Sequence, residues 1–265
     1  MQYPWRSVWL AATGWILLAW VVAALGAEGP WPGDRIPTAK GDLWIHPVSH
    51  ATFVLRWDGK AIYVDPVGGS KAFAGFPRPD LVLVTHFHGD HLDAATLASL
   101  VGPQGGVPIV GPPSVIDRLQ GPLRDAGRAI VAGQKAEVAG IPIEAVPAYN
   151  LTPQRQRFHP KGRDVGYVVA LSDKRVYIAG DTEDTPEMRG LGNIDVAFLP
   201  MNLPYTMSVA QAAGAVRQFR PKIVYPYHFR NADGTLADLD EFRRQVGDEA
   251  GVEVRVRQWY PAAGR

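Results

Sequence analysis

The sequence contains no cysteine and no cluster of like charge. Its 265 residues offer no thiol, so disulfides, cysteine catalysis and thiolate metal sites are excluded, and histidine, aspartate and glutamate remain as metal ligands. The 27 basic and 26 acidic residues give a formal net charge of +1. Because no basic patch stands out among them, nothing favours nucleic acid as a partner. The apolar fraction of 46% is that of a globular chain with a large core.

Apolar runs long enough to cross a membrane are absent too, with one exception near the N-terminus. Residues 8–27 carry no charge and could span a bilayer as a helix. Small residues at 24–27 also fit the cleavage point of a secretory signal, so residues 1–27 are predicted to be either a signal sequence or a transmembrane anchor. Arg6 precedes the run, which favours a body outside the cytoplasm. We therefore expect an exported, periplasmic or extracytoplasmic protein with a Gly- and Pro-rich linker at 28–39.

Residues 40–265 have the pattern of one folded domain. Strands are expected at 43–46, 51–55, 61–64, 81–85, 108–110, 135–138, 141–146, 167–171, 175–178, 195–199, 223–225 and 252–256. Asp93, Ser114 and Ser208 are typical helix N-caps, and they predict helices over 94–101, from 114 to about 126, and after 208. A further helix is expected at 239–246. Strands that alternate with helices in this way indicate an α/β fold.

The strands come in two batches that resemble each other. The hairpin at 53–65 parallels the one at 167–181, and in both the second strand runs into an aspartate. The stretch at 79–84 likewise parallels 194–199, and 108–110 parallels 222–224. This weak internal similarity predicts a pseudo-twofold, four-layer αβ/βα sandwich, in which strand-end loops from both halves meet at one edge.

The densest group of ligand-type residues follows the apolar run at 81–84, in the order His86-Phe87-His88-Gly89-Asp90-His91. Imidazole nitrogens and carboxylate oxygens are the ligands that zinc, manganese and iron accept. Alternate histidines in extended backbone can project to one side, and the tight turn at Gly89 can bring Asp90 and His91 to a neighbouring point. This spacing predicts a metal site.

The order and content of these loops resemble the metallo-β-lactamase fold superfamily. The residues that carry the resemblance are Val64-Asp65-Pro66, the stretch 86–91, Ala179-Gly180-Asp181-Thr182 and Val224-Tyr225-Pro226-Tyr227-His228. They are most similar to the branch of metal-dependent hydrolases that includes ascorbate-6-phosphate lactonases and N-acyl-phosphatidylethanolamine phospholipase D. The resemblance covers residues 43–259 and implies the four-layer sandwich predicted above.

The resemblance also implies a two-metal site. His86 and His88 would bind the first ion, Asp90 and His91 the second, Asp181 would bridge both, and His228 would complete the second. The ions would be two divalent metals, zinc or else manganese or iron. Asp65 would orient one of the ligand histidines.

One departure from the family pattern concerns the third ligand of the first ion. Asn150 stands where the family has a histidine. Two alternatives remain open: His159 folds back to replace it, or the first ion has a weaker shell with Asn150 nearby. His46 and His50 are further possibilities, and His50 precedes a strand near the equivalent of the family's first hairpin, where it could face a substrate. For both, a structural or surface role is favoured.

The predicted function is metal-dependent hydrolysis. A metal-bridging hydroxide would attack an ester, a lactone or a phosphodiester, with Asp90 or Asp181 helping to orient it. The alternatives are a non-catalytic metal-binding scaffold and a true β-lactamase. The expected partner is a small-molecule or lipid substrate, with membrane contact through residues 1–27 if they are retained; the sequence indicates no oligomeric state. Met201, Tyr205 and Met207 could contact an apolar substrate or belong to the core.

Overall fold

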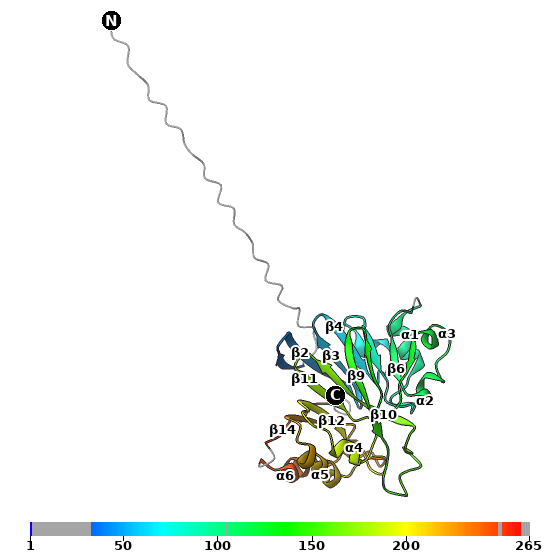
Figure 1. The fold of residues 1–265 in the computed structure, drawn as a ribbon, viewed down its shortest axis with the longest axis vertical. Coiled ribbons are helices and arrows are strands. Elements are labelled where there is room, and N and C mark those ends of the chain that lie inside the picture. The colour runs from blue at the N-terminus through cyan, green and yellow to red at the C-terminus, as the bar shows by residue number, and fades with distance from the viewer. Residues whose placement is uncertain (2–32, 104, 249–250, 261–265) are drawn as a thin grey trace.

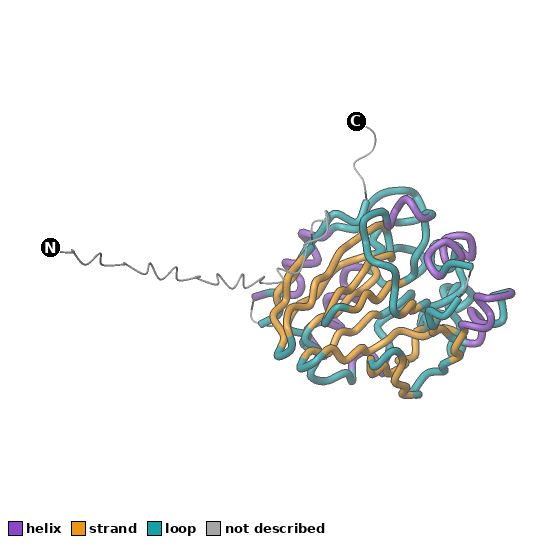
Figure 2. The backbone as a smooth tube through the Cα atoms, turned by 90° about the horizontal axis from the view of Figure 1, so that it is seen from above, coloured by secondary structure: helices purple, strands orange, loops and turns teal. Residues whose placement is uncertain are grey.

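The computed structural model describes residues 1, 33–103, 105–248 and 251–260. The predicted signal sequence or anchor at 1–27, and the first part of the predicted linker, therefore lie outside the described residues. Within the described ranges the chain forms two seven-stranded sheets with helices on their outer faces (Figures 1 and 2).

The two sheets have the same topology. The first contains β1 (Asp34–Thr38), β2 (Gly41–Ser49), β3 (Thr52–Trp57), β4 (Lys60–Val64), β5 (Leu81–Leu83), β6 (Ile109–Gly111) and β7 (Gly127–Ala129) in chain order. The second contains β8 (Lys135–Val138), β9 (Ile141–Ala148), β10 (Asp164–Leu171), β11 (Lys174–Ile178), β12 (Val196–Pro200), β13 (Ile223–Tyr227) and β14 (Glu253–Val254). In each sheet the first four strands are antiparallel and the last three continue in parallel.

Matching hydrogen bonds confirm the predicted internal repeat. Asp80 lies before β5, and its Oδ2 accepts a bond from the Ala61 amide at 2.8 Å. Asp195 lies before β12, and its Oδ2 accepts a bond from the Arg175 amide at the same distance. Each aspartate thus links the start of a parallel strand to the second strand of the preceding hairpin. The equivalent hydrogen bond is found at the equivalent position in both halves.

The core lies between the sheets and under the helices. Phe53 of the first sheet stacks on Phe198 of the second, with ring centroids 4.2 Å apart. Tyr167 also crosses between the sheets, where its hydroxyl donates to the Val84 carbonyl at 2.7 Å. Helices α1 (Ala94–Val101), α2 (Pro113–Ile116) and α3 (Gly121–Ala126) cover the first sheet, whereas α4 (Pro186–Arg189), α5 (Val209–Phe219) and α6 (Leu239–Val246) accompany the second. A 3₁₀ turn occupies Ser70–Phe73. The predicted four-layer sandwich is confirmed.

Two local predictions are wrong. Strand β1 occupies 34–38, inside the predicted linker at 28–39, because these residues pair with β2 and bury Ile36. The single helix predicted from Ser114 to about 126 is two short helices. Gly121, at a φ of +51°, and the following proline start a new helix there, and the Ser114 hydroxyl donates to the Arg163 carbonyl instead of capping.

Candidate metal centre

The predicted ligand residues meet where strand-end loops of both sheets converge. The cluster at 86–91 follows β5, Asp181 follows β11, and His228 follows β13. His159 arrives from the loop between β9 and β10. The residues converge because β11 and β13 run in the same direction within the second sheet and end at one edge, where the loop after β5 of the first sheet also lies. A cavity of about 370 Å³ opens beside them, lined by His88, Asp90, Phe158, His159, Asp181, Asn202 and Tyr205.

The first group of potential ligands is made of His86, His88 and His159. One nitrogen from each lies within 4.8 Å of the other two. His86 Nε2 and His88 Nδ1 are 3.1 Å apart. Two imidazoles bound to one tetrahedral ion, with bonds of about 2.0–2.1 Å, would place their nitrogens about 3.3 Å apart. The spacing of these side chains therefore fits a metal ion.

The second group is made of His91, His228 and Asp90. His91 Nε2 lies 3.1 Å from His228 Nε2, a spacing that fits a shared ion as well. Asp90 Oδ2 lies 3.3 Å from His228 Nε2 and 3.9 Å from His91 Nε2. All the ligand atoms of this group thus face one point, from loops that belong to different sheets.

Asp181 stands between the two groups. Its Oδ2 lies 3.5 Å from His159 Nε2 in the first group. Its Oδ1 lies 3.4 Å from His91 Nε2 and 3.5 Å from His228 Nε2 in the second. Oδ1 is buried and has no hydrogen-bond partner among the described residues. A buried carboxylate oxygen without a partner is costly, and a cation shared by these side chains would satisfy it.

In three of the histidines, the ring nitrogen that points away from the cluster lies within hydrogen-bond distance of another polar side chain. Asp65 Oδ2 accepts from His91 Nδ1 at 2.8 Å, and the same carboxylate accepts from the Thr85 amide at 2.7 Å. Thr85 Oγ1 lies 3.0 Å from His86 Nδ1, and Asp164 Oδ2 lies 3.2 Å from His159 Nδ1. Such partners fix the ring and the tautomer so that the other nitrogen faces a metal. The orienting role predicted for Asp65 agrees with this placement.

Asn150 does not face the cluster. Its amide nitrogen donates to the carbonyls of Arg155 and Tyr205 at 3.0 and 2.7 Å. Its backbone amide donates to the His159 carbonyl at 2.8 Å. Of the two alternatives left open by the sequence, the structure therefore brings His159 to the first group, and Asn150 braces the loop that carries this histidine.

His50 is the residue whose place sequence reasoning ranked too low. Its Nε2 lies 3.2 Å from Asp90 Oδ2, and its ring centroid lies 3.7 Å from that of His228. It was expected to be structural or on the surface, but it sits at the end of the β2–β3 hairpin, on the same edge as the other loops. That position in the hairpin was the available signal. His46, by contrast, is buried beside Trp44 and Phe76, outside the cluster.

Burial and neighbouring charges shift the pKa values of His86, His88 and Asp90. Burial and the neighbouring imidazoles lower the pKa of His86 well below its ordinary value, and they lower the pKa of His88 too. Burial alone would raise the pKa of Asp90, but hydrogen bonds with His228 and His50 outweigh it and hold that pKa far below its usual range. Both histidines are thus neutral, and Asp90 is ionised, at neutral pH. These are the forms that bind metals.

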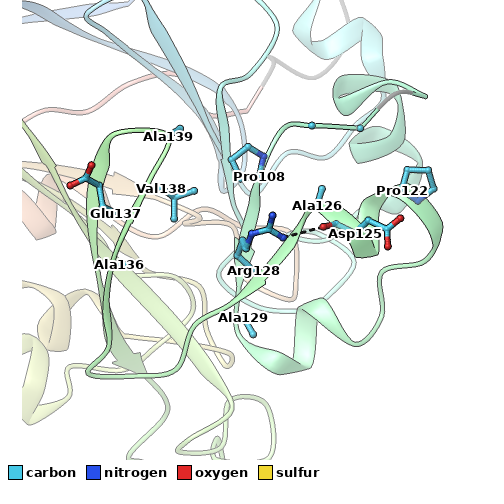
Figure 3. A pocket seen from close by; sticks show the side chains of 12 residues that line it. Pro108, Pro122, Asp125, Ala126, Arg128, Ala129, Ala136, Glu137, Val138 and Ala139 are labelled. Carbon is cyan, nitrogen blue, oxygen red and sulfur yellow. Dashed lines mark hydrogen bonds between the residues drawn. The ribbon is translucent and has the colours of Figure 1, made fainter.

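A larger cavity, of about 670 Å³, lies between the edge strands β7 and β8 (Figure 3). Its charged side chains are Asp125, Arg128 and Glu137, and it is lined by no histidine. Arg128 donates to the Asp125 carbonyl at 3.0 Å, and so turns partly back toward the end of α3. Size alone therefore does not identify the site, and the smaller cavity carries the metal-ligand chemistry.

Three comparisons bear on the family. The sequence profile described as the beta-lactamase superfamily domain matches residues 45–228. The UPF0173 metal-dependent hydrolase of Pyrococcus horikoshii is 35% identical over 217 residues, which cover 78% of this chain and 93% of that protein. A solved metal-dependent hydrolase from Parabacteroides distasonis has a TM-score of 0.77 and 39% identity, and the match covers 87% of this chain and 100% of that one. Igni18, a metallo hydrolase from Ignicoccus hospitalis, has a TM-score of 0.65 and 26% identity, covering 81% and 94%.

The prediction of an exported protein is wrong on these findings. No helix in the described part of the chain is long and apolar enough to cross a membrane. The relatives from Pyrococcus horikoshii, Methanopyrus kandleri and Pyrococcus abyssi share 93% of their own length with this chain, and they are named as metal-dependent hydrolases.

The fold, the converging ligands and the relatives agree with one another. The narrower likeness to ascorbate-6-phosphate lactonases and N-acyl-phosphatidylethanolamine phospholipase D stays a prediction. The coarser one is confirmed, since the profile spans well over half of the chain and the Pyrococcus relative is aligned over nearly its whole length. The chain belongs to the beta-lactamase superfamily, among its UPF0173 metal-dependent hydrolases.

Proposed function

We propose that this protein hydrolyses an ester, a lactone or a phosphodiester of a small molecule or lipid, with two divalent ions held by seven side chains. His86, His88 and His159 would hold the first ion, Asp90, His91 and His228 the second, and Asp181 both. The observation that carries the proposal is the placement of Asp181, which offers one carboxylate oxygen to each group. Zinc suits these ligands, and manganese and iron are the alternatives.

Two divalent ions held by these side chains would activate a water and stabilise negative charge on the substrate. The chain's own residues supply the rest. Asp90 is held ionised and has a half-exposed side chain at the cavity, so its carboxylate can orient an attacking water. Asp181 is buried and is fixed between His159 and His91, so it can set the spacing of the two ions.

The alternatives predict different outcomes in one experiment. The full chain would be purified without added chelator, analysed for metal, and assayed with an aryl ester, a thiolactone, an aryl phosphodiester and nitrocefin. We expect close to two equivalents of metal, and turnover of at least one of the first three substrates that is lost in His88→Ala. Two metals without any turnover would favour the scaffold, nitrocefin turnover would favour the β-lactamase, and failure to retain metal would refute the proposal.

A further inference from the structure

One residue in the wall of the metal cavity has an amide nitrogen that donates to none of the described residues. Asn202 lies two residues beyond β12 and is only 2% exposed, yet it lines the cavity together with Asp181 and His159. The neighbouring Met201 amide donates to the His228 carbonyl at 3.2 Å. The segment that carries Asn202 is therefore fastened directly to a residue of the proposed second metal site.

Hydrogen bonds fix which way the Asn202 side chain points. Its backbone amide donates to Thr206 Oγ1 at 3.1 Å, so the Thr206 hydroxyl is free to donate its own hydrogen. The Thr206 hydroxyl donates that hydrogen to Asn202 Oδ1 at 2.5 Å. The carbonyl end of the amide is thereby assigned as the acceptor, and Nδ2 takes the other position.

The backbone carbonyl of Asn202 also has hydrogen-bond partners. Its backbone carbonyl accepts from the amides of Tyr205 and Thr206 at 2.9 and 3.0 Å. Among the described residues, only Nδ2 has no hydrogen-bond acceptor. Nδ2 is not shut away from solvent, so it is open to the cavity that the residue lines. An oxygen of a molecule bound in the cavity can accept from it.

The remainder of the lining restricts the chemistry of that ligand. Phe158 and Tyr205 form an edge-to-face pair with ring centroids 5.0 Å apart, which gives the cavity one aromatic wall. No lysine or arginine is among the described residues that line it. A carboxylic ester, a lactone or a singly charged phosphodiester needs only one donor and the metal ions.

On the basis of the proposed hydrolysis, we infer that Asn202 Nδ2 donates a hydrogen bond to the oxygen of the scissile carbonyl or phosphoryl group. Negative charge grows on that oxygen in the transition state, and a fixed donor in a site that excludes water stabilises it. Thr206 is a positioning residue, because it turns the amide so that nitrogen faces the cavity. The substrate is an ester with an apolar group that lies against Phe158 and Tyr205.

The test compares Asn202→Ala and Asn202→Asp with the metal-loaded wild-type chain. We expect Asn202→Ala to lower kcat by about 10²–10³-fold with little change in KM, the effect of removing one such donor. Asn202→Asp keeps the acceptor for Thr206 but turns the donor into a negative oxygen, so it should be at least as slow. Thr206→Val should lose part of the activity, and Thr206→Ser should keep it. Asn193→Asp, at an exposed turn, is the matched control.

A binding measurement separates this inference from the proposed hydrolysis. Inorganic phosphate is a tetrahedral oxyanion, and calorimetry would give its affinity for each metal-loaded variant. We expect binding to weaken about tenfold in Asn202→Ala and further in Asn202→Asp, while metal content and thermal midpoint stay at the wild-type values. Equal phosphate affinity and equal kcat in wild type and Asn202→Asp would overturn the inference. Phosphate binding that depends on Asn202, without turnover of any substrate, would instead count against the hydrolysis alone.

Discussion

His50 shows how a single hydrogen bond can separate two roles for one side chain. The Tyr260 hydroxyl accepts from the Arg230 amide at 3.0 Å and lies 3.0 Å from His50 Nδ1. Its own hydrogen is then left for Nδ1, which places the imidazole hydrogen on Nε2, facing Asp90. In this tautomer His50 would donate to Asp90 and would not bind a metal ion.

The tautomer leads to a prediction that metal analysis can check. His50→Ala should keep the wild-type metal content and lower kcat, because Asp90 loses the donor that orients it. His228→Ala, which removes a proposed ligand of the second ion, should lose about one equivalent. Loss of one equivalent in His50→Ala as well would show that His50 is a ligand after all.

His91 should make metal binding depend on pH. Burial alone would lower the pKa of His91, but the carboxylates of Asp181 and Asp65 outweigh it and raise that pKa to about 10 in the metal-free protein. A histidine ligand must be neutral, so each metal bound there should release close to one proton at pH 8. Apparent affinity should therefore increase about tenfold per pH unit below 10. Titration calorimetry in two buffers of different ionisation enthalpy measures the release, and a value near zero would contradict the assignment.

The same pKa predicts how stability changes with pH. A histidine whose pKa is about 6.5 when unfolded and about 10 when folded stabilises the fold fully below 6.5. Its contribution is lost as the pH rises from 6.5 to 10. Denaturant unfolding of the chelated protein should show this loss, and the metal-loaded protein, in which His91 is already neutral, should not.

At the scale of elements, the loop at 150–159 is held by one buried carboxylate. Glu183 accepts from the amides of Leu151 and Thr152, both at 2.6 Å, and from Arg155 Nη1 at 2.7 Å. This loop delivers His159 to the first group of ligands. No local sequence pattern marks Glu183 for this role, because the loop that covers it meets it only in the tertiary fold.

Glu183→Gln should loosen the loop and so weaken the first metal site. We expect affinity for the first ion to decrease by about 10–100-fold, the usual effect of losing an outer partner of a metal ligand. Unfolding free energy should decrease by about 1.5–3 kcal/mol, because Arg155 loses a charged acceptor. Competition with a chelating dye measures the affinity. Glu187→Gln, whose carboxylate accepts from the Tyr149 hydroxyl outside the cluster, is the control, and an equal loss in that variant would contradict the prediction.

Elements with strong local signals could be predicted from sequence, and those set by tertiary contacts could not. Helix α1 begins after Asp93, whose side chain accepts from the amides of Ala95 and Thr96 as a cap should. The helix expected over 114–126 failed because its apolar pattern continues through Gly121, where backbone geometry starts a new helix. Strand β1 carries little apolar pattern of its own and forms only because β2 pairs with it.

At the scale of the whole molecule, local spacing and the family resemblance together revealed more than half of the site. Local spacing exposed the cluster at 86–91, all from one half. Asp181 and His228 followed from the family resemblance, which places them after matching strands of the second half. His50 and the choice between His159 and Asn150 depend on how loops from different strands fold over the edge. No local spacing encodes that arrangement.

The proposed ions should act as ties between the two halves of the fold. His86, His88, Asp90 and His91 come from the first half, and His159, Asp181 and His228 come from the second. Because unfolding separates these ligands, metal binds the native state and stabilises it by RT ln(1 + [L]/Kd), about 4 kcal/mol when free metal is 1,000 times Kd. Chelation should therefore lower the thermal midpoint, and restored metal should raise it in proportion to the logarithm of its concentration. Asp181→Ala removes the one residue shared by both groups and should abolish most of this dependence. If the thermal midpoint of the wild-type chain did not change with metal concentration, the cluster at the sheet edge would bind no ion.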